Sequence, residues 1–383
     1  MRTPQDTATP AGLNRALLAR QGLLERHPVA RGALAAAVER LGAIQAQQWS
    51  SPPVGLWSRL AGFAPADLWA ALDAGHLVTG ILMRRTLHLV SAAEHPVYAR
   101  IAAETGIDGW LLRGVPTPER AGTMLAATVG YATTARTGDE LAAFAEEWVR
   151  EHPDALPAEA VAAQREYAWR PFRAQPAFVK VPADGDWGAR TPAAYRAGPP
   201  TPPKLRSEDA WDTVVARHLG AFGPAGADDV AYWLGAPTAS VKAALDRLDV
   251  VTLRESTGRR VLYDLAGAPR PADDTPAPPR FLPAFDNALL AYAANRRARI
   301  LPEAYKDRVY VKANLRWLPT LLVDGMVAGT WAAETKRGVA TLTVTTFARL
   351  ARAVAAAVQA EAEALVRVVS PGAKDHAVRI TTS

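Results

Sequence analysis

The sequence predicts an α+β protein made of three tandem winged-helix units and a C-terminal β-rich domain with a terminal helix. Two stretches of the sequence, 13–90 and 211–265, support this prediction. Each has segments with helical apolar spacing, followed by two short β-rich segments around a polar turn. That element order is typical of a winged helix. Pro-rich segments at 198–203 and 269–279 enclose the clearer stretch and are expected to be linkers. The expected boundaries are 1–115, 116–203, 204–268 and 280–383.

The first unit is expected to follow a polar, disordered N-terminus at 1–9. Its predicted helices are 13–26, 31–47 and 66–74. Pro52-Pro53 is expected to end the second of these helices. Two β-rich runs, 77–81 and 86–90, then flank Met83-Arg84-Arg85, and this pattern indicates a hairpin with a basic tip.

The later units are predicted in the same way. In the second we expect helices at 119–133 and 137–150 and a closing strand at 177–181. In the third we expect helices at 211–219, 227–234 and 238–248. Strand runs at Leu253 and 261–265 flank its polar loop, which has Arg254, Arg259 and Arg260. The last part is expected to begin with short strands and a turn at Asp324-Gly325, and to end in an Ala-rich helix at 346–367.

The composition excludes several kinds of site. The 383 residues include no cysteine, so a disulfide framework, a thiolate zinc site, a cysteine-ligated iron-sulfur cluster and a cysteine nucleophile are ruled out. The seven histidines are scattered without metal-ligand spacing, so we expect no metal and no other cofactor. No apolar run is long enough for a membrane span, and we expect a cytoplasmic, nucleoid-associated monomer.

The charge favours an anionic partner. The net charge is +6, and only seven of the 44 basic residues are lysines, the first being Lys180. Guanidinium groups suit bidentate contacts with phosphate, so a nucleic acid is the favoured partner. The alternative is a composition bias, because the chain is also rich in alanine and proline.

Four runs of sequence resemble a known family. The runs LGAIQAQ (41–47), VGLWSRL (54–60), MRRTLHLVS (83–91) and LPAFDN (282–287) are similar to those of the AlkZ-like winged-helix DNA glycosylases. The resemblance implies excision of bulky N7-alkylguanine adducts, including interstrand crosslinks, from double-stranded DNA held in a cleft between the domains. It also implies that the catalytic signature is Gln45 and Gln47, separated by Ala46, which is smaller than the apolar residue of the family pattern.

The chemistry of two glutamines limits the substrate. A carboxamide does not titrate near neutral pH, so neither Gln45 nor Gln47 can be a general base of the usual kind. An N7-alkylated guanine already carries a positive charge and leaves without protonation. Amide oxygens are then sufficient to place a water molecule and to stabilise an oxocarbenium-like sugar.

Helix geometry sets a condition on this mechanism. Residues i and i+2 of an α-helix point about 200° apart, so the helix must end at or inside the motif, with a non-helical turn at Ala46, if both amides are to face one water molecule. In a continuous helix Gln48 would share a face with Gln45 and would be the competitor. The simpler interpretation is that these glutamines are solvated residues at a helix end.

The candidate DNA-binding residues are the basic side chains of the two expected hairpins together with one histidine: Arg84, Arg85, His88, Arg254, Arg259 and Arg260. His88 is either a half-buried strand residue or a contact to phosphate or lesion. Asp286 and Asn287 are either a structural turn or part of the cleft wall.

Two other functions compete with a glycosylase. One is a non-enzymatic winged-helix regulator, although such proteins usually have a dimerisation surface that sets the half-site spacing. The other is a resistance protein that only sequesters a drug or its adduct. If the chain is a glycosylase, the lack of lysine before Lys180 predicts monofunctional cleavage, because strand nicking generally uses an amine to form a Schiff base.

Overall fold

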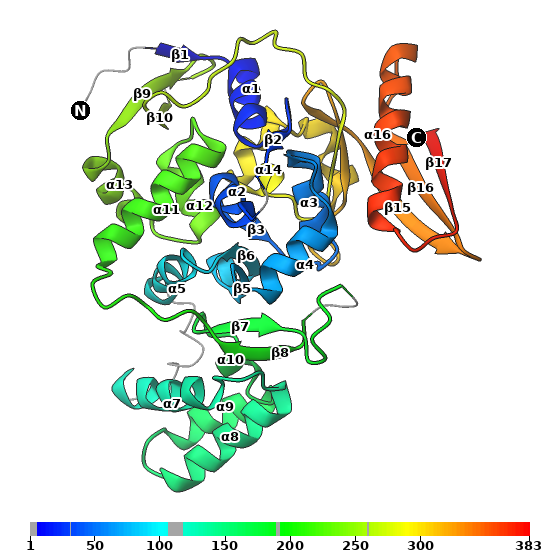
Figure 1. Ribbon diagram of the computed structural model, residues 1–383. Coiled ribbons are helices and arrows are strands. Elements are labelled where there is room, and N and C mark those ends of the chain that lie inside the picture. Colours follow the sequence, from blue (N-terminus) through cyan, green and yellow to red (C-terminus); the bar gives the residue numbers. More distant parts are fainter. Residues whose placement is uncertain (1–5, 31, 106–117, 189–191, 259) are drawn as a thin grey trace. The chain divides into compact units, whose positions relative to one another are not determined.

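The computed structural model describes residues 6–30, 32–105, 118–188, 192–258 and 260–383 (Figure 1). The chain divides into two compact units, 1–68 with 212–383, and 69–211. The described residues form both helices and strands, which confirms the α+β class. The four predicted domains, 1–115, 116–203, 204–268 and 280–383, divide the chain differently and stay a prediction, as does the winged-helix assignment.

The first unit begins with three helices, α1 (Pro10–Arg20), α2 (Leu34–Leu41) and α3 (Ser51–Arg59). The predicted helix 31–47 is too long, because Gly42 ends α2 in the left-handed conformation with φ 78° and Ala43 follows with φ 58°. Pro52-Pro53 was expected to end that helix, but the pair begins α3. Proline is tolerated in the first turn of a helix, where its missing N–H has no intrahelical partner.

Short strands connect these helices. They are β2 (His27–Pro28), β3 (Ile44–Gln45) and β4 (Leu60–Ala61), and β2 pairs with β4 in parallel. The chain before α1 is not wholly irregular as expected, because β1 (Asp6–Ala8) adds to β9 as a parallel strand. Residues 1–5 lie outside the described part of the chain.

The region of the clearest sequence pattern has the predicted element order. It contains α11 (Ser207–Phe222), α12 (Ala227–Leu234), α13 (Thr238–Arg247), β9 (Val250–Glu255) and β10 (Val261–Leu265). The two strands are antiparallel, with Leu253 opposite Leu262. Leu13 of α1 joins these two leucines in one core cluster.

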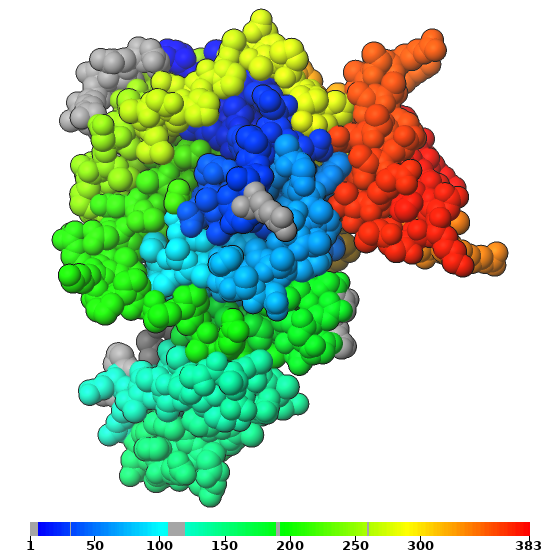
Figure 2. Space-filling model, in the orientation of Figure 1, coloured from blue at the N-terminus to red at the C-terminus, as the bar shows by residue number. Residues whose placement is uncertain are grey.

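The Pro-rich segment 269–279 does not act as a free linker. Arg15 Nε donates a hydrogen bond of 2.7 Å to the carbonyl oxygen of Thr275, and Arg20 Nη2 donates one of 3.2 Å to that of Pro269. Figure 2 shows the segment running over α1 on the surface of the first unit. These contacts connect the N-terminal helix to the beginning of the C-terminal region.

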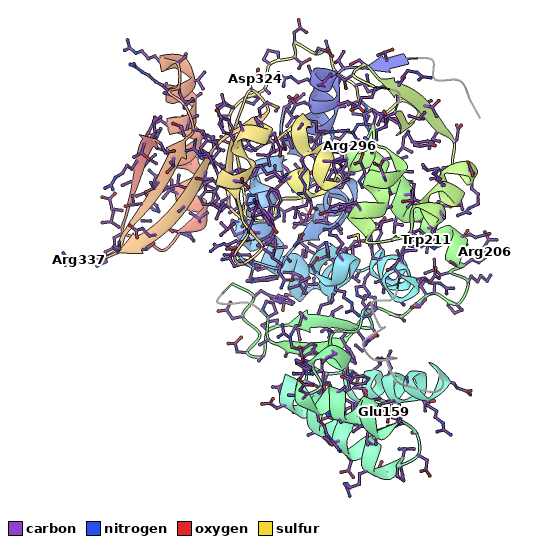
Figure 3. The ribbon with its side chains drawn as sticks, turned by 180° about the vertical axis from the view of Figure 1, so that it is seen from behind. Glu159, Arg206, Trp211, Arg296, Asp324 and Arg337 are labelled. Atoms are coloured by element: carbon purple, nitrogen blue, oxygen red, sulfur yellow. The ribbon has the colours of Figure 1, made fainter. Side chains whose placement is uncertain are left out.

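The C-terminal sheet has the order β11-β14-β15-β16-β17. Its strands are β11 (Arg280–Leu282), β14 (Thr320–Val323), β15 (Met326–Lys336), β16 (Val339–Thr346) and β17 (Asp375–Thr382). The turn predicted at Asp324-Gly325 is confirmed, because both residues have positive φ, as a two-residue hairpin turn requires. Figure 3 shows Asp324 at this turn and Arg337 at the tip of the following hairpin.

Helix α16 (Arg352–Val369) packs on this sheet (Figure 1), with Val358, Ala362 and Leu365 in a core that also contains Phe281 and Leu342. The helix begins six residues later than predicted, and the chain does not end in it, since β17 returns parallel to β16. Small elements fill the region between β11 and β14: α14 (Asn287–Leu290), η2 (Ala294–Arg299), η3 (Glu303–Tyr305), α15 (Lys306–Val309), β12 (Tyr310–Val311) and β13 (Arg316–Trp317).

The second unit contains the predicted hairpin, β5 (Leu77–Ile81) and β6 (Leu87–Ser91), paired antiparallel. Strand β7 (Phe178–Val181), the predicted closing strand, pairs with β5 and with β8 (Ala194–Ala197). The helices are α4 (Pro65–Asp73), whose first residues belong to the first unit, α5 (His95–Glu104), α7 (Pro118–Tyr131), α8 (Gly138–Glu151), α9 (Ala158–Glu166) and α10 (Arg170–Arg173). Among the described residues, no helix has both the length and the apolar character needed to cross a bilayer.

Candidate active site

The glutamine motif lies in the first unit, immediately after α2. Because α2 ends at Leu41, the motif is not helical, and Gln45 is the second residue of β3. Gln45 and Gln47 therefore do not lie in one α-helix, which would have pointed their side chains about 200° apart. Gln45 is buried, with 6% of its surface exposed, whereas Gln47 is exposed. Gln48, the competitor in a continuous helix, donates a hydrogen bond of 3.0 Å from Nε2 to Ser50 Oγ.

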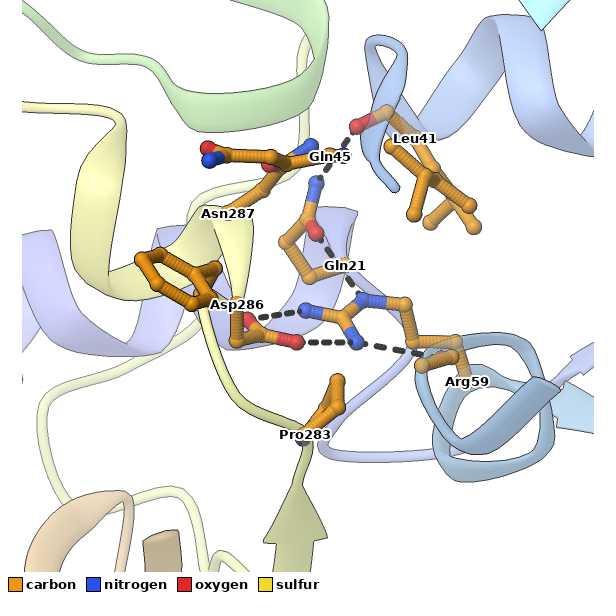
Figure 4. A pocket seen from close by; sticks show the side chains of 10 residues that line it. Gln21, Leu41, Gln45, Arg59, Pro283, Asp286 and Asn287 are labelled. Carbon is orange, nitrogen blue, oxygen red and sulfur yellow. Dashed lines mark hydrogen bonds and ion pairs between the residues drawn. The ribbon is translucent and has the colours of Figure 1, made fainter. Parts of the chain in front are cut away.

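A small pocket adjoins Gln45 (Figure 4). Its volume is about 10 Å³, which is room for about one water molecule. The polar residues that line it are Gln21, Gln45, Arg59, Asp286 and Asn287. Leu41, Ile44, Gly55, Pro283 and Phe285 complete the lining. The pocket is thus built from α1, α2, β3, α3 and the segment that follows β11.

A buried ion pair forms one wall of the pocket. Arg59 Nη2 lies 2.7 Å from Asp286 Oδ1, and Arg59 Nη1 lies 2.9 Å from Asp286 Oδ2. The two side chains are only 4% and 3% exposed. Arg59 also donates to the Gln21 side-chain oxygen at 3.0 Å and to the Gly55 carbonyl at 3.0 Å. Such additional hydrogen bonds are what a buried pair needs in order to offset the cost of desolvation.

Asp286 is not available as a general base. Both of its oxygens accept hydrogen bonds from Arg59, and Oδ1 also accepts one of 2.8 Å from the backbone N–H of Ala288, which caps α14. The carboxylate is therefore neutralised by a charge of opposite sign. Asp286 and Asn287 were expected to be either a structural turn or part of the cleft wall; in the structure Asp286 caps α14, Asn287 is the first residue of that helix, and both line the pocket.

The candidate DNA-binding arginines lie in both compact units. Arg84 and Arg85 occupy the turn between β5 and β6, both in the left-handed conformation with φ 53° and 59°, and Arg85 is exposed. Arg254, on β9, is exposed as well. Arg260 pairs with Asp228 and, at 2.7 Å, with Asp229. Arg259 lies outside the described residues.

His88 is more deeply buried than the half-buried strand residue that one of its two interpretations expected. It is fully buried on β6, and its Nδ1 lies 2.8 Å from the carbonyl oxygen of Thr86. Burial, together with the charge of Arg84, lowers the pKa of His88 from 6.5 to about 3. The imidazole is therefore neutral at physiological pH and lies in the interior, away from any phosphate that the surface could bind.

Comparison with known proteins identifies the family of this chain. The family model described as "DNA glycosylase AlkZ-like" matches residues 38–368. The chain belongs to this family. It is also 26% identical over 352 residues to a protein named "Interstrand DNA cross-link repair glycosylase" from Streptomyces sahachiroi, covering 86% of this chain and 89% of that protein. The AlkZ-like resemblance predicted from the sequence is thus confirmed.

A solved structure supports the fold of this AlkZ-like chain. The DNA glycosylase AlkZ of Streptomyces sahachiroi superposes with a TM-score of 0.74 at 22% identity, over 98% of this chain and all of that chain. As a member of the AlkZ-like family, the chain is a DNA glycosylase, an enzyme that acts on N-glycosyl bonds.

Sequence reasoning missed part of the AlkZ-like pocket. Gln21 and Arg59 were not among the candidate residues, and only the folded structure shows that they line the same pocket as Gln45. One signal for Arg59 was present, since it lies in the run 54–60 that resembles the family. Another was its place beside Leu56 and Leu60, where a charged side chain needs a buried partner.

Proposed function

We propose that the chain is a monofunctional glycosylase that hydrolyses the N-glycosidic bond of N7-alkylguanine in double-stranded DNA and leaves an abasic site. The observation that carries this proposal is the position of Gln45 beside a pocket for about one water molecule. The end of α2 before the motif supports it as well, because residues 45 and 47 then leave the helical geometry that would separate them.

In the proposed reaction, the water oxygen bonds to C1′ of the deoxyribose while the bond from C1′ to N9 breaks. The bonding electrons return to the cationic base, which leaves uncharged, and the proton of the water passes to solvent. The side-chain oxygens of Gln45 and Gln47 accept hydrogen bonds from the water and orient it. Their dipoles stabilise the positive charge on the sugar, so a normal, uncharged guanine is not a substrate.

Bulky adducts and interstrand crosslinks are included in the proposed substrate class. The relative from Streptomyces sahachiroi is named for crosslink repair, and its similarity covers most of both chains. Monofunctional cleavage is supported by the lack of lysine before Lys180, which leaves Gln45 without a nearby amine in sequence for Schiff-base formation.

The proposed DNA contacts come from the hairpin turns of two winged-helix-like regions. Arg85 and Arg254 are exposed and suited to phosphate, and Arg84 precedes Arg85 in the turn between β5 and β6. Arg84 and Arg85 both hold a left-handed conformation that costs about 1–2 kcal/mol per residue, and strained residues of this kind cluster at functional sites. Arg260 is proposed to support the loop through its pairs with Asp228 and Asp229.

Replacing Arg85 by alanine is expected to weaken binding to all duplexes to a similar degree. If Arg85 neutralises one phosphate, the slope of log affinity against log salt falls by about 1. Fluorescence anisotropy at several salt concentrations measures this slope. Arg150→Ala is the matched control, because Arg150 is also an exposed arginine of the second unit, on α8. An equal change in both variants would contradict a specific contact.

The decisive experiment for the function uses two substrates, a duplex with N7-methylguanine and a duplex with an N7-guanine crosslink. After incubation with excess enzyme, we expect strand breaks at the lesion only after mild heating in alkali, and more of them than in a sample without enzyme. Breaks without alkali would exclude monofunctional cleavage. Tight binding without any breaks would favour a regulator or a sequestering protein over a glycosylase.

A further inference from the structure

We infer that Asn287 is a positioning residue whose side-chain carboxamide holds the backbone that carries Gln45. The inference rests on the proposed function, because it assigns to Asn287 a part in the same site. Asn287 is the first residue of α14 and is buried, with 6% of its surface exposed. It lines the pocket next to Gln45 (Figure 4).

Asn287 contacts the strand on both sides of Ile44. Its Nδ2 donates a hydrogen bond to the carbonyl oxygen of Ala43, and its Oδ1 accepts one of 3.4 Å from the backbone N–H of Gln45. In a parallel ladder, one residue makes this same pair of bonds, to the carbonyl before and the N–H after the residue opposite. The carboxamide of Asn287 therefore takes the place of one residue of a parallel strand.

The segment before Gln45 needs such a partner. Gly42 and Ala43 are both left-handed, and this conformation is unfavourable for alanine because it has a Cβ atom. The hydrogen bonds of Asn287 hold the backbone of Ala43, which is strained, and the backbone of Gln45, which carries the proposed catalytic side chain. They fix the backbone of Gln45 and so the direction in which its side chain enters the pocket.

Asn287 is itself held by the ion pair below the pocket. Asp286, its neighbour, is bound by Arg59, and Arg59 Nε donates to Gln21 Oε1. Gln21 Nε2 in turn donates a hydrogen bond of 3.2 Å to the carbonyl oxygen of Leu41, the last residue of α2. Both ends of the turn from Leu41 to Gln45 are thus bound to one framework, which makes the turn rigid.

The same contacts give Asn287 a positioning role in this proposal. One N–H of its Nδ2 and one lone pair of its Oδ1 are directed at backbone groups, so the plane of the carboxamide is set by the strand that it holds. Only a side chain with a donor and an acceptor on one planar group can make both bonds. Aspartate has the same shape but lacks the donor, which makes Asn287→Asp the closest matched variant.

The test compares the full-length wild type with Asn287→Asp and Asn287→Ala. We expect the single-turnover rate of N7-methylguanine excision to fall about 10- to 100-fold in both variants, because a displacement of the order of 1 Å has an effect of that size. The dissociation constant for the same duplex should change less than about twofold, since Asn287 does not contact DNA in this proposal. Hydrogen exchange should speed up at 43–49 and stay unchanged in β14 to β16.

Three outcomes would overturn the inference: a wild-type rate in both variants, a loss of rate that only follows a loss of folded protein, or unchanged exchange at 43–49. If the wild type excises no base at all, the proposed function fails. Hydrogen exchange at 43–49 still decides the role of Asn287 in that case, because it measures the backbone without any substrate.

Discussion

Replacing Gln45 by alanine is expected to slow excision of N7-methylguanine by about 100- to 1,000-fold, the usual effect of removing one preorganised polar group that stabilises a transition state. Gln45 is buried beside a pocket with room for about one water molecule, so its removal takes away one of the two amide oxygens proposed to orient the reacting water. Single-turnover kinetics with saturating enzyme measures the rate, and anisotropy measures DNA binding, which should be retained.

Gln48→Ala is the matched control for this variant. Gln48 lies three residues away and makes a local hydrogen bond with Ser50, so its loss should leave the rate within about twofold. Gln47→Ala is expected to behave like Gln45→Ala if both amides act on one water molecule. Equal losses of rate and of folded protein in the Gln45 and Gln48 variants would identify the motif as structural.

The elements predicted correctly are those whose pattern is local. The hairpin at 77–91 has β-rich runs around a turn, and the sequence from Ala227 to Leu265 has two helix signals followed by two strand signals within short distances. The end of α2 was missed, because Gly42 and Ala43 look like ordinary residues of an Ala-rich helix. The carbonyl oxygen of Ala43 and the N–H of Gln45 are bound by Asn287, more than 240 residues later in the chain.

The site followed the same rule. Gln45 became a candidate because a run of seven residues resembles a family motif, and short motifs can be read from sequence. Arg59 and Gln21 were missed because their roles depend on which side chain meets them in the folded chain, and spacing along the sequence does not contain that information. A buried polar network such as that of Gln21, Arg59 and Asp286 forms only through tertiary contacts, so local sequence patterns do not predict it.

A second buried ion pair gives the largest expected effect on stability. Arg20, at the end of α1, makes hydrogen bonds of 2.7 and 2.8 Å with the two oxygens of Asp264 on β10, and it also donates one of 2.8 Å to the carbonyl of Leu219 on α11. The side chains are 1% and 0% exposed. Asp264→Ala should lower the free energy of unfolding by about 3–5 kcal/mol, because it leaves a buried guanidinium without its counter-charge.

The double variant Arg20→Met/Asp264→Leu separates two effects on the free energy of unfolding: the contribution of the ion pair itself, and the penalty of leaving one of its charges buried and unpaired. Replacing both charges with apolar side chains removes the unpaired charge, so most of the loss in Asp264→Ala should be recovered. Urea unfolding, followed by tryptophan fluorescence and by hydrogen exchange in β10, measures all three proteins. A double variant as unstable as Asp264→Ala would mean that the loss comes from hydrogen bonds and packing, the bond from Arg20 to the Leu219 carbonyl included, and not from an unpaired buried charge.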